Sequence, residues 1–166
     1  PDDELEEARL TMPEDQFEQE FEVSFQAAVS GAYYGKQIQK AEREDRITDI
    51  EYDPNNEVET WWDLGIGDST AIWFAQRSGS EIHLIDYLET SGESLAYYAK
   101  EIEAKGYNYG RHIAPHDITT RELGTGKSRL EVARDLGIDF EVCPKLEIDH
   151  GIEAVRNNLD NCWFDK

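Results

Sequence analysis

The stretch Trp61-Trp62-Asp63-Leu64-Gly65-Ile66-Gly67-Asp68 decides the fold of this chain. Residues 59–66 predict a strand because aromatic and aliphatic side chains dominate them, and Gly65 and Gly67 then predict a tight turn. A carboxylate in the middle of so apolar a strand needs a reason, since burying an unpaired charge is costly. A bound metal ion would supply it, and the two glycines leave room for a substrate to approach. The alternative is an ordinary Asp63 at a strand end, facing solvent or capping the turn.

Two further strands follow this one along the chain. Residues 70–77 and 81–88 are again rich in aliphatic and aromatic side chains, and Ser78-Gly79-Ser80 separates them. Loops as short as these join neighbouring antiparallel strands. The sequence therefore predicts a three-strand antiparallel meander.

After Gly92 the apolar side chains recur with helical spacing. Helices are expected over residues 95–105, 128–136 and 149–159, and the second of them starts with a capping box made by Ser128 and Glu131. Short strands, 111–115 and 139–143, lie between these helices, and Cys162-Trp163-Phe164 begins a further element. This order of elements predicts an α/β fold in which a mixed sheet is flanked by helices.

An acidic arm precedes this domain. Residues 1–22 contain ten acidic residues and one basic residue. Residues 13–30 predict a helix with a stripe of phenylalanines (Phe17, Phe21 and Phe25) that must dock on something. A second, mostly polar helix is expected over residues 36–46. We therefore expect residues 1–46 to form a helical linker or arm and residues 47–166 to form the main domain.

The composition excludes several function classes. The 166 residues carry a net charge of −21, which argues against a free-standing polyanion binder and against adhesion to anionic membranes. No apolar run approaches the roughly 20 residues of a membrane span. One stretch, residues 111–134, is locally basic and could hold a phosphate backbone, unless it is simply a solvated helix face. Its candidate DNA contacts are Arg121, Lys127 and Arg129.

Asp117 is the second candidate carboxylate. It follows the short strand 111–115, and if that strand runs parallel beside the strand that carries Asp63, both carboxylates meet at one edge of the sheet. Converging carboxylates suit Mg²⁺ or Mn²⁺, and two such metals about 4 Å apart can clamp a phosphodiester. Asp68 could be an auxiliary ligand from the turn. The plainer alternative for both Asp117 and Asp68 is a turn residue.

An ordered series of motifs, from about Glu14 to the end of the chain, resembles the nuclease domain of the tailed-phage terminase large subunit, which has a ribonuclease-H-like fold. The motifs are Tyr33-Tyr34-Gly35-Lys36, Trp62-Asp63-Leu64-Gly65-Ile66-Gly67-Asp68-Ser69-Thr70, Ile85-Asp86-Tyr87-Leu88-Glu89, Pro115-His116-Asp117, Arg121-Glu122-Leu123-Gly124-Thr125-Gly126-Lys127-Ser128-Arg129 and Cys162-Trp163-Phe164-Asp165.

The resemblance implies a metal-dependent endonuclease that cuts concatemeric double-stranded DNA during genome packaging. By motif match, Asp63 would bridge the metals of a two-metal Mg²⁺ or Mn²⁺ site, Asp117 would be the second ligand, and Asp68 a possible auxiliary one. The family's third catalytic Asp lies downstream of the Cys-Trp-Phe-Asp motif. We therefore expect the nuclease domain to be truncated at Lys166.

The resemblance also implies partners and a location. An ATPase motor domain on the N-terminal side, a small terminase subunit and a portal would act with this domain in the host cytoplasm, without a membrane. Two alternatives stay open. The chain could be another ribonuclease-H-like nuclease, of the junction resolvase or transposase type, or a non-catalytic interaction module that docks through its phenylalanine stripe.

Overall fold

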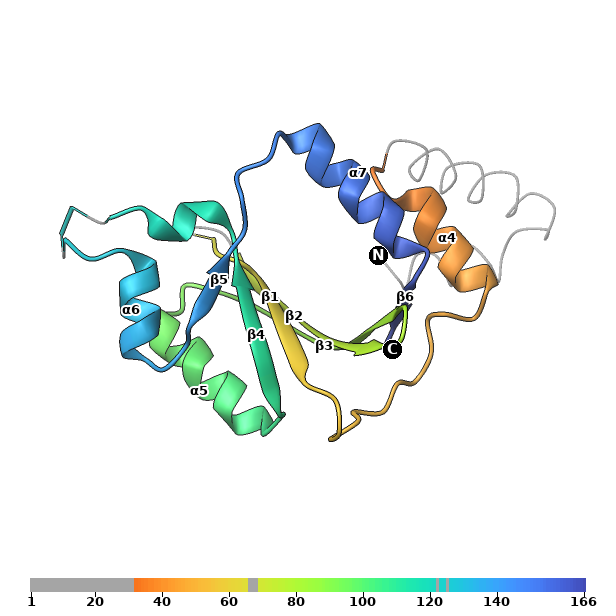
Figure 1. The fold of residues 1–166 in the computed structure, drawn as a ribbon, viewed down its shortest axis with the longest axis horizontal. Helices are drawn as coiled ribbons and strands as arrows, with labels where there is room; N and C mark the ends of the chain where they lie inside the picture. Colours follow the sequence, from red (N-terminus) through yellow and green to blue (C-terminus); the bar gives the residue numbers. More distant parts are fainter. Residues whose placement is uncertain (1–31, 66–68, 122, 125) are drawn as a thin grey trace, which may run out of the picture.

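A computed structural model describes residues 32–65, 69–121, 123–124 and 126–166 of the chain (Figure 1). The helix predicted over residues 13–30, with its phenylalanine stripe, lies outside these ranges, and so does Asp68. Within the described ranges, no helix has the length and apolar character needed to cross a membrane.

A six-stranded sheet forms the centre of the domain, in the order β5-β4-β1-β2-β3-β6 (Figure 1). Strands β1, β2 and β3 are the predicted antiparallel meander. Strand β4 pairs in parallel with β1, β5 with β4, and β6 with β3, which confirms the mixed sheet. The strands are β1 (Val58–Asp63), β2 (Ser69–Ser78), β3 (Glu81–Ser91), β4 (Tyr109–Ala114), β5 (Phe140–Val142) and β6 (Cys162–Phe164).

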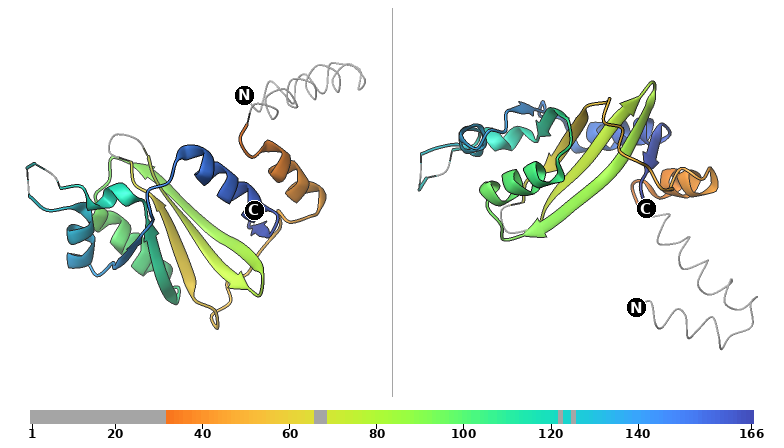
Figure 2. Two further views of the ribbon diagram at one scale, coloured as in Figure 1. Left: turned by 45° about the horizontal axis from the view of Figure 1, so that its top comes forward. Right: turned by 90° about the horizontal axis from the view of Figure 1, so that it is seen from below.

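Helices lie on both faces of this sheet (Figure 2). Two of them, α5 and α6, pack on the face that holds the larger core cluster, and α7 packs on the opposite face through Leu159. Ser94 caps α5 and Gly106 ends it in the left-handed conformation, at φ 67°. The helices are α4 (Gly35–Arg43), α5 (Leu95–Lys105), α6 (Arg129–Asp135) and α7 (Ile148–Leu159), and the 3-10 helix η2 spans His116–Thr119.

Trp62 anchors the larger core. Its ring meets the ring of Tyr98 on α5 and the ring of Phe140 on β5 edge to face, with centroids 6.0 and 5.0 Å apart. Successive side chains of a strand point to opposite faces. Because Trp62 points under α5, its neighbours Trp61 and Asp63 must point to the other face of the sheet.

A short polar chain runs through the same core. The indole nitrogen of Trp62 donates to the hydroxyl of Thr60, 2.7 Å away, and that hydroxyl lies 2.7 Å from Nδ1 of His112. Burial lowers the pKa of His112 and so favours the neutral ring, and in the tautomer that carries its proton on Nε2 the Nδ1 atom accepts the Thr60 proton. The buried hydroxyl is therefore satisfied as both acceptor and donor, and it links β1 to β4.

The helix predicted over residues 36–46 is α4, but it ends at Arg43. Asp45 then adopts a positive φ of 54°, and the chain turns so that Arg46 is buried. The Nη1 atom of Arg46 donates to the carbonyl oxygens of Leu159 and Cys162, at 3.0 and 2.5 Å. One guanidinium thus fastens the end of α4 to the last turn of α7 and to the start of β6.

We predict that Arg46→Ala lowers the free energy of unfolding by about 3 kcal/mol, because it leaves two buried carbonyl groups without their charged donor. Urea melts followed by circular dichroism would measure the change. Arg43→Ala is the matched control: Arg43 is the exposed last residue of α4, three positions before Arg46, and its replacement should change the free energy of unfolding by no more than about 0.5 kcal/mol. Equal losses in the two variants would contradict this role for Arg46.

Candidate functional site

The parallel pairing of β1 with β4 brings the two candidate carboxylates to one edge of the sheet. Trp61 lies opposite Ile113 in this pair, so the strands run forward together toward the same edge. Asp63 is the last residue of β1, and Asp117 lies in η2, which directly follows β4. The parallel pairing of these two strands, on which the expected meeting of the carboxylates depends, is therefore what the structure shows.

Asp63 itself is placed differently from the prediction. It is exposed and ends its strand, where it pairs with Ala71 of β2, rather than lying in the middle of a buried strand. The strand stops there because Leu64 and Gly65 leave the ladder. The burial argument for a metal at Asp63 is thus wrong, and what remains of the prediction is the position of Asp63 at the same edge of the sheet as η2, which carries Asp117.

Asp117 is held by a cation on one side only. Its Oδ2 accepts a hydrogen bond from Nη2 of Arg129 at 3.4 Å. Its Oδ1 is shielded from solvent and has no hydrogen-bond partner among the described residues. A shielded carboxylate oxygen without a donor is costly, unless a cation binds there.

The donors present fit a hard divalent cation. Carboxylate oxygens are the ligands of Mg²⁺ and Mn²⁺, and Mg²⁺ is commonly held by one or two carboxylates together with waters and substrate phosphates. Asp63 and Asp117 could supply those carboxylates. No cluster of three or more His, Cys, Asp or Glu side chains suited to a metal occurs in the part of the chain that the structure describes. The predicted role of Asp68 lies outside that part.

Two polar neighbours of Asp63 escaped the sequence analysis. Ala71 pairs with both Asp63 and Glu89, so all three lie on one face, and Tyr87 donates to Glu89 Oε2 at 2.8 Å. This hydrogen bond is the main cause of two pKa shifts: it lowers the pKa of Glu89 and raises the pKa of Tyr87. Burial and the negative charges of Glu89 and Asp63 raise the pKa of Tyr87 further. A bulge between Phe74 and Ala75 shifts the β2–β3 register by one residue, so counting residues from the turn would not have found Glu89.

The basic stretch is neutralised within the chain. All five of its cations, Arg111, Arg121, Lys127, Arg129 and Arg134, form ion pairs with acidic side chains. Arg121 and Lys127 are exposed, and exposed pairs contribute little to stability. Replacing the carboxylate partner of either side chain by a phosphate group would therefore cost little free energy. Arg129 differs, because only 13% of its side chain is exposed.

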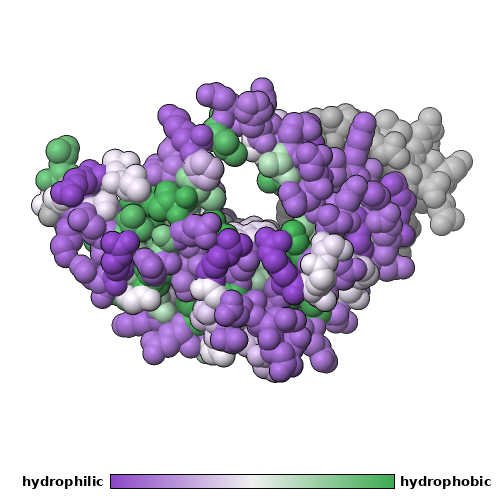
Figure 3. All heavy atoms as spheres, viewed as in Figure 1, coloured by the Kyte–Doolittle hydropathy of each residue, from purple (hydrophilic) through white to green (hydrophobic). Residues whose placement is uncertain are grey.

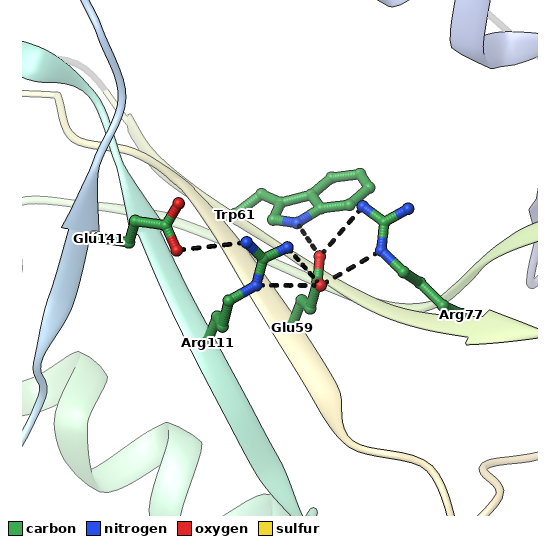
Figure 4. Close-up of polar contacts among 5 residues, drawn as sticks. All are labelled: Glu59, Trp61, Arg77, Arg111 and Glu141. Carbon is green, nitrogen blue, oxygen red and sulfur yellow. Dashed lines mark hydrogen bonds and ion pairs between the residues drawn. The ribbon is translucent and has the colours of Figure 1, made fainter.

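A hollow of about 460 Å³ opens on the sheet face that carries Trp61 and Arg77, between the sheet and α7 (Figure 3). Beside it, Glu59 accepts from Arg111 at 2.7 Å, from Arg77 at 3.2 Å and from the indole nitrogen of Trp61 at 3.2 Å (Figure 4). Arg111 also donates to Glu141 of β5. This network, centred on Glu59, ties four strands together.

The structure is similar to solved large terminases. The nuclease domain of the phage P22 large terminase matches with a TM-score of 0.55 and 15% identity, over 74% of this chain and 69% of that one. The large terminase nuclease of the thermophilic phage G20c, with bound cobalt, matches with a TM-score of 0.53 and 13% identity, over 73% and 70% of the two chains. The chain has the fold of large terminase nuclease domains. The resemblance inferred from the motifs is thereby confirmed for the fold.

Further comparisons show how far the similarity to terminases extends. The large terminase of the thermophilic bacteriophage D6E matches with a TM-score of 0.55 and 12% identity over 74% of this chain, but the match spans only 32% of that terminase. Neither a protein-family model nor a curated protein matches the sequence. The G20c nuclease has also been solved with bound magnesium. The similarity to large terminases is therefore found by comparing structures and rests on the fold.

The Glu59 network predicts a pH dependence of stability. Burial raises the pKa of Glu59, but hydrogen bonds from Arg111, Arg77 and Trp61 outweigh it, so this pKa lies below its ordinary value of 4.5. A lowered pKa stabilises the fold above the ordinary value, and the gain is lost as the pH falls through the lowered value. We expect Glu59→Gln to cost about 1–2 kcal/mol at pH 7 and much less near pH 3.

Thermal melts of Glu59→Gln and the wild type across this pH range would measure the difference. Glu141→Gln is the matched control, since Glu141 is exposed and contacts the network only through Arg111. A difference between wild type and Glu59→Gln that stays constant down to pH 3 would show that the charge of Glu59 contributes nothing.

Proposed function

We propose that the chain is the metal-dependent endonuclease domain of a phage DNA-packaging terminase, which cuts concatemeric double-stranded DNA by two-metal phosphodiester hydrolysis with Mg²⁺ or Mn²⁺. One observation carries the proposal: the β1–β4 pairing places Asp63 and Asp117 at one sheet edge, in a fold shared with terminase nucleases. The cobalt and magnesium found in the G20c nuclease support the use of a divalent metal.

In this proposal the chain's own residues have separate roles. Asp63 and Oδ1 of Asp117 would hold the cations, with Asp68 as an auxiliary ligand. Divalent cations bound there supply Lewis-acid stabilisation of the phosphodiester and lower the pKa of a bound water. Asp63 is open to solvent, so a phosphodiester can reach it from outside.

DNA would be held by the exposed cations of the basic stretch. Arg121 and Lys127 lie near the base of the loop that the Arg121–Ser128 bridge closes, and their exchangeable ion pairs leave them able to bind phosphates. The net charge of −21 opposes free binding to DNA, so we propose that the motor domain, the small terminase subunit and the portal deliver DNA in the host cytoplasm. In this scheme residues 47–166 are the nuclease and residues 1–46 join it to the motor.

We predict that Asp63→Asn and Asp117→Asn each lower metal-dependent nicking of supercoiled plasmid at least about 100-fold, because each removes a carboxylate that would hold the cation. The same variants should lose the rise in melting temperature that Mn²⁺ gives the wild type. Asp139→Asn is the matched control: the Asp139 side chain is 83% exposed and pairs with Arg134, away from both candidate carboxylates, so both properties should stay.

The two measurements separate the parts of the proposal. Stabilisation by metal together with nicking, both lost in Asp63→Asn, supports site and activity alike. Stabilisation without nicking supports the site but not an active nuclease within these residues. If the wild type shows neither, or if Asp63→Asn nicks as the wild type does, the proposal is wrong.

A further inference from the structure

Arg129 is a cation at an unfavourable place on its helix. It is the first residue of α6, directly after the N-cap Ser128. The amino end of a helix carries partial positive charge, which disfavours a cation there by about 0.3–1 kcal/mol. The side chain is nonetheless drawn in to 13% exposure, whereas Arg134 on the same helix is 61% exposed. Contacts outside the helix must therefore account for the position of Arg129.

Those contacts reach the segment that follows β1 and the carboxylate of Asp117. Nη1 of Arg129 donates to the backbone carbonyl of Leu64 at 3.3 Å, and Nη2 donates to Oδ2 of Asp117 at 3.4 Å. Leu64 directly follows Asp63 in the chain. One planar guanidinium thus joins the end of β1, next to Asp63, to the carboxylate of Asp117.

The start of α6 is itself fixed, which gives the guanidinium a stable base. Ser128 accepts from the backbone N–H of Glu131 at 3.2 Å, and the Glu131 carboxylate accepts from the backbone N–H of Ser128 at 2.8 Å. Ser128 also forms a bridge with Arg121 across the loop. This capping box leaves Arg129 little freedom other than the rotation of its own side chain.

The contact with Arg129 gives the two carboxylate oxygens of Asp117 different surroundings. Oδ2 is taken by the guanidinium, while Oδ1 is shielded and has no partner within the described ranges. A carboxylate that binds a metal through one oxygen is commonly oriented by a hydrogen bond to the other, and loss of such a partner costs 10–100-fold in metal affinity. The arrangement around Asp117 has this form.

We propose that Arg129 is a positioning residue, which holds Asp117 and the end of β1 so that Asp117 Oδ1 faces a divalent cation. The inference rests on the proposed function, and it gives Arg129 a task other than the DNA contact that its charge suggests. Lysine cannot replace it fully, because one ammonium group lacks the planar fork that reaches two acceptors at once.

Mn²⁺ titrations followed by electron paramagnetic resonance, at a temperature where every variant is folded, would test this. We expect Arg129→Ala to raise the dissociation constant for Mn²⁺ about 10-fold and Arg129→Lys to raise it less. Arg134→Ala should bind as the wild type does, because Arg134 contacts Asp139 and neither carboxylate of the site. A merely structural role would lower the melting temperature without changing the affinity of the folded protein.

Thermal melts without metal give a second, independent readout. If Arg129 holds Asp117, the effects of Arg129→Ala and Asp117→Asn on the melting temperature should not add in the double variant. Additive effects on the melting temperature, or an unchanged Mn²⁺ affinity in both Arg129 variants, would overturn the inference about Arg129. The proposed function would still stand in that case, provided that the wild type binds Mn²⁺. If the wild type binds no Mn²⁺, the proposed function itself fails.

Discussion

The parallel hydrogen bonding of β4 to β1 is the constraint on which the candidate site depends. Asp63 and Asp117 are far apart in the sequence, and they meet because both strands end at the same edge of the sheet. Arg129 then spans this edge from α6, bound to Asp117 and to the carbonyl of Leu64. The pairing brings the two chain segments together, and the guanidinium sets how their ends lie relative to each other.

Burial of Trp62 decides which face of the sheet each neighbour takes. Trp62 is locked between Tyr98 and Phe140, so Trp61 and Asp63 must face the other way, and a shift of one residue would reverse all three. The same alternation places Glu59 beside Trp61, where Arg77 and Arg111 can reach it. The packing of Trp62 in the core on one face of the sheet thus determines which charged side chains meet on the other face.

Charge pairing shows where reasoning from the sequence reaches its limit. The sum of charges over residues 111–134 correctly marks a basic stretch, but a sum cannot reveal that Arg111 meets Glu59 or that Arg129 meets Asp117. These partners lie 52 and 12 positions apart. The first pair comes together when β4 pairs with β1, and the second when α6 packs on η2. For Asp63, the apolar neighbours suggested burial, but a strand end leaves its last side chain open to solvent.

Local rules were sufficient for much of this chain. The glycine turns determined the meander, the Ser128–Glu131 spacing determined the start of α6, and the order of elements limited the fold to a mixed sheet with helices, because each of these features depends on residues close in sequence. The tertiary structure alone decided that Asp63 is exposed, that Glu89 shares its face, and that Arg129 turns inward to Asp117. Burial and ion pairing depend on which distant segments pack together, and no local pattern encodes that.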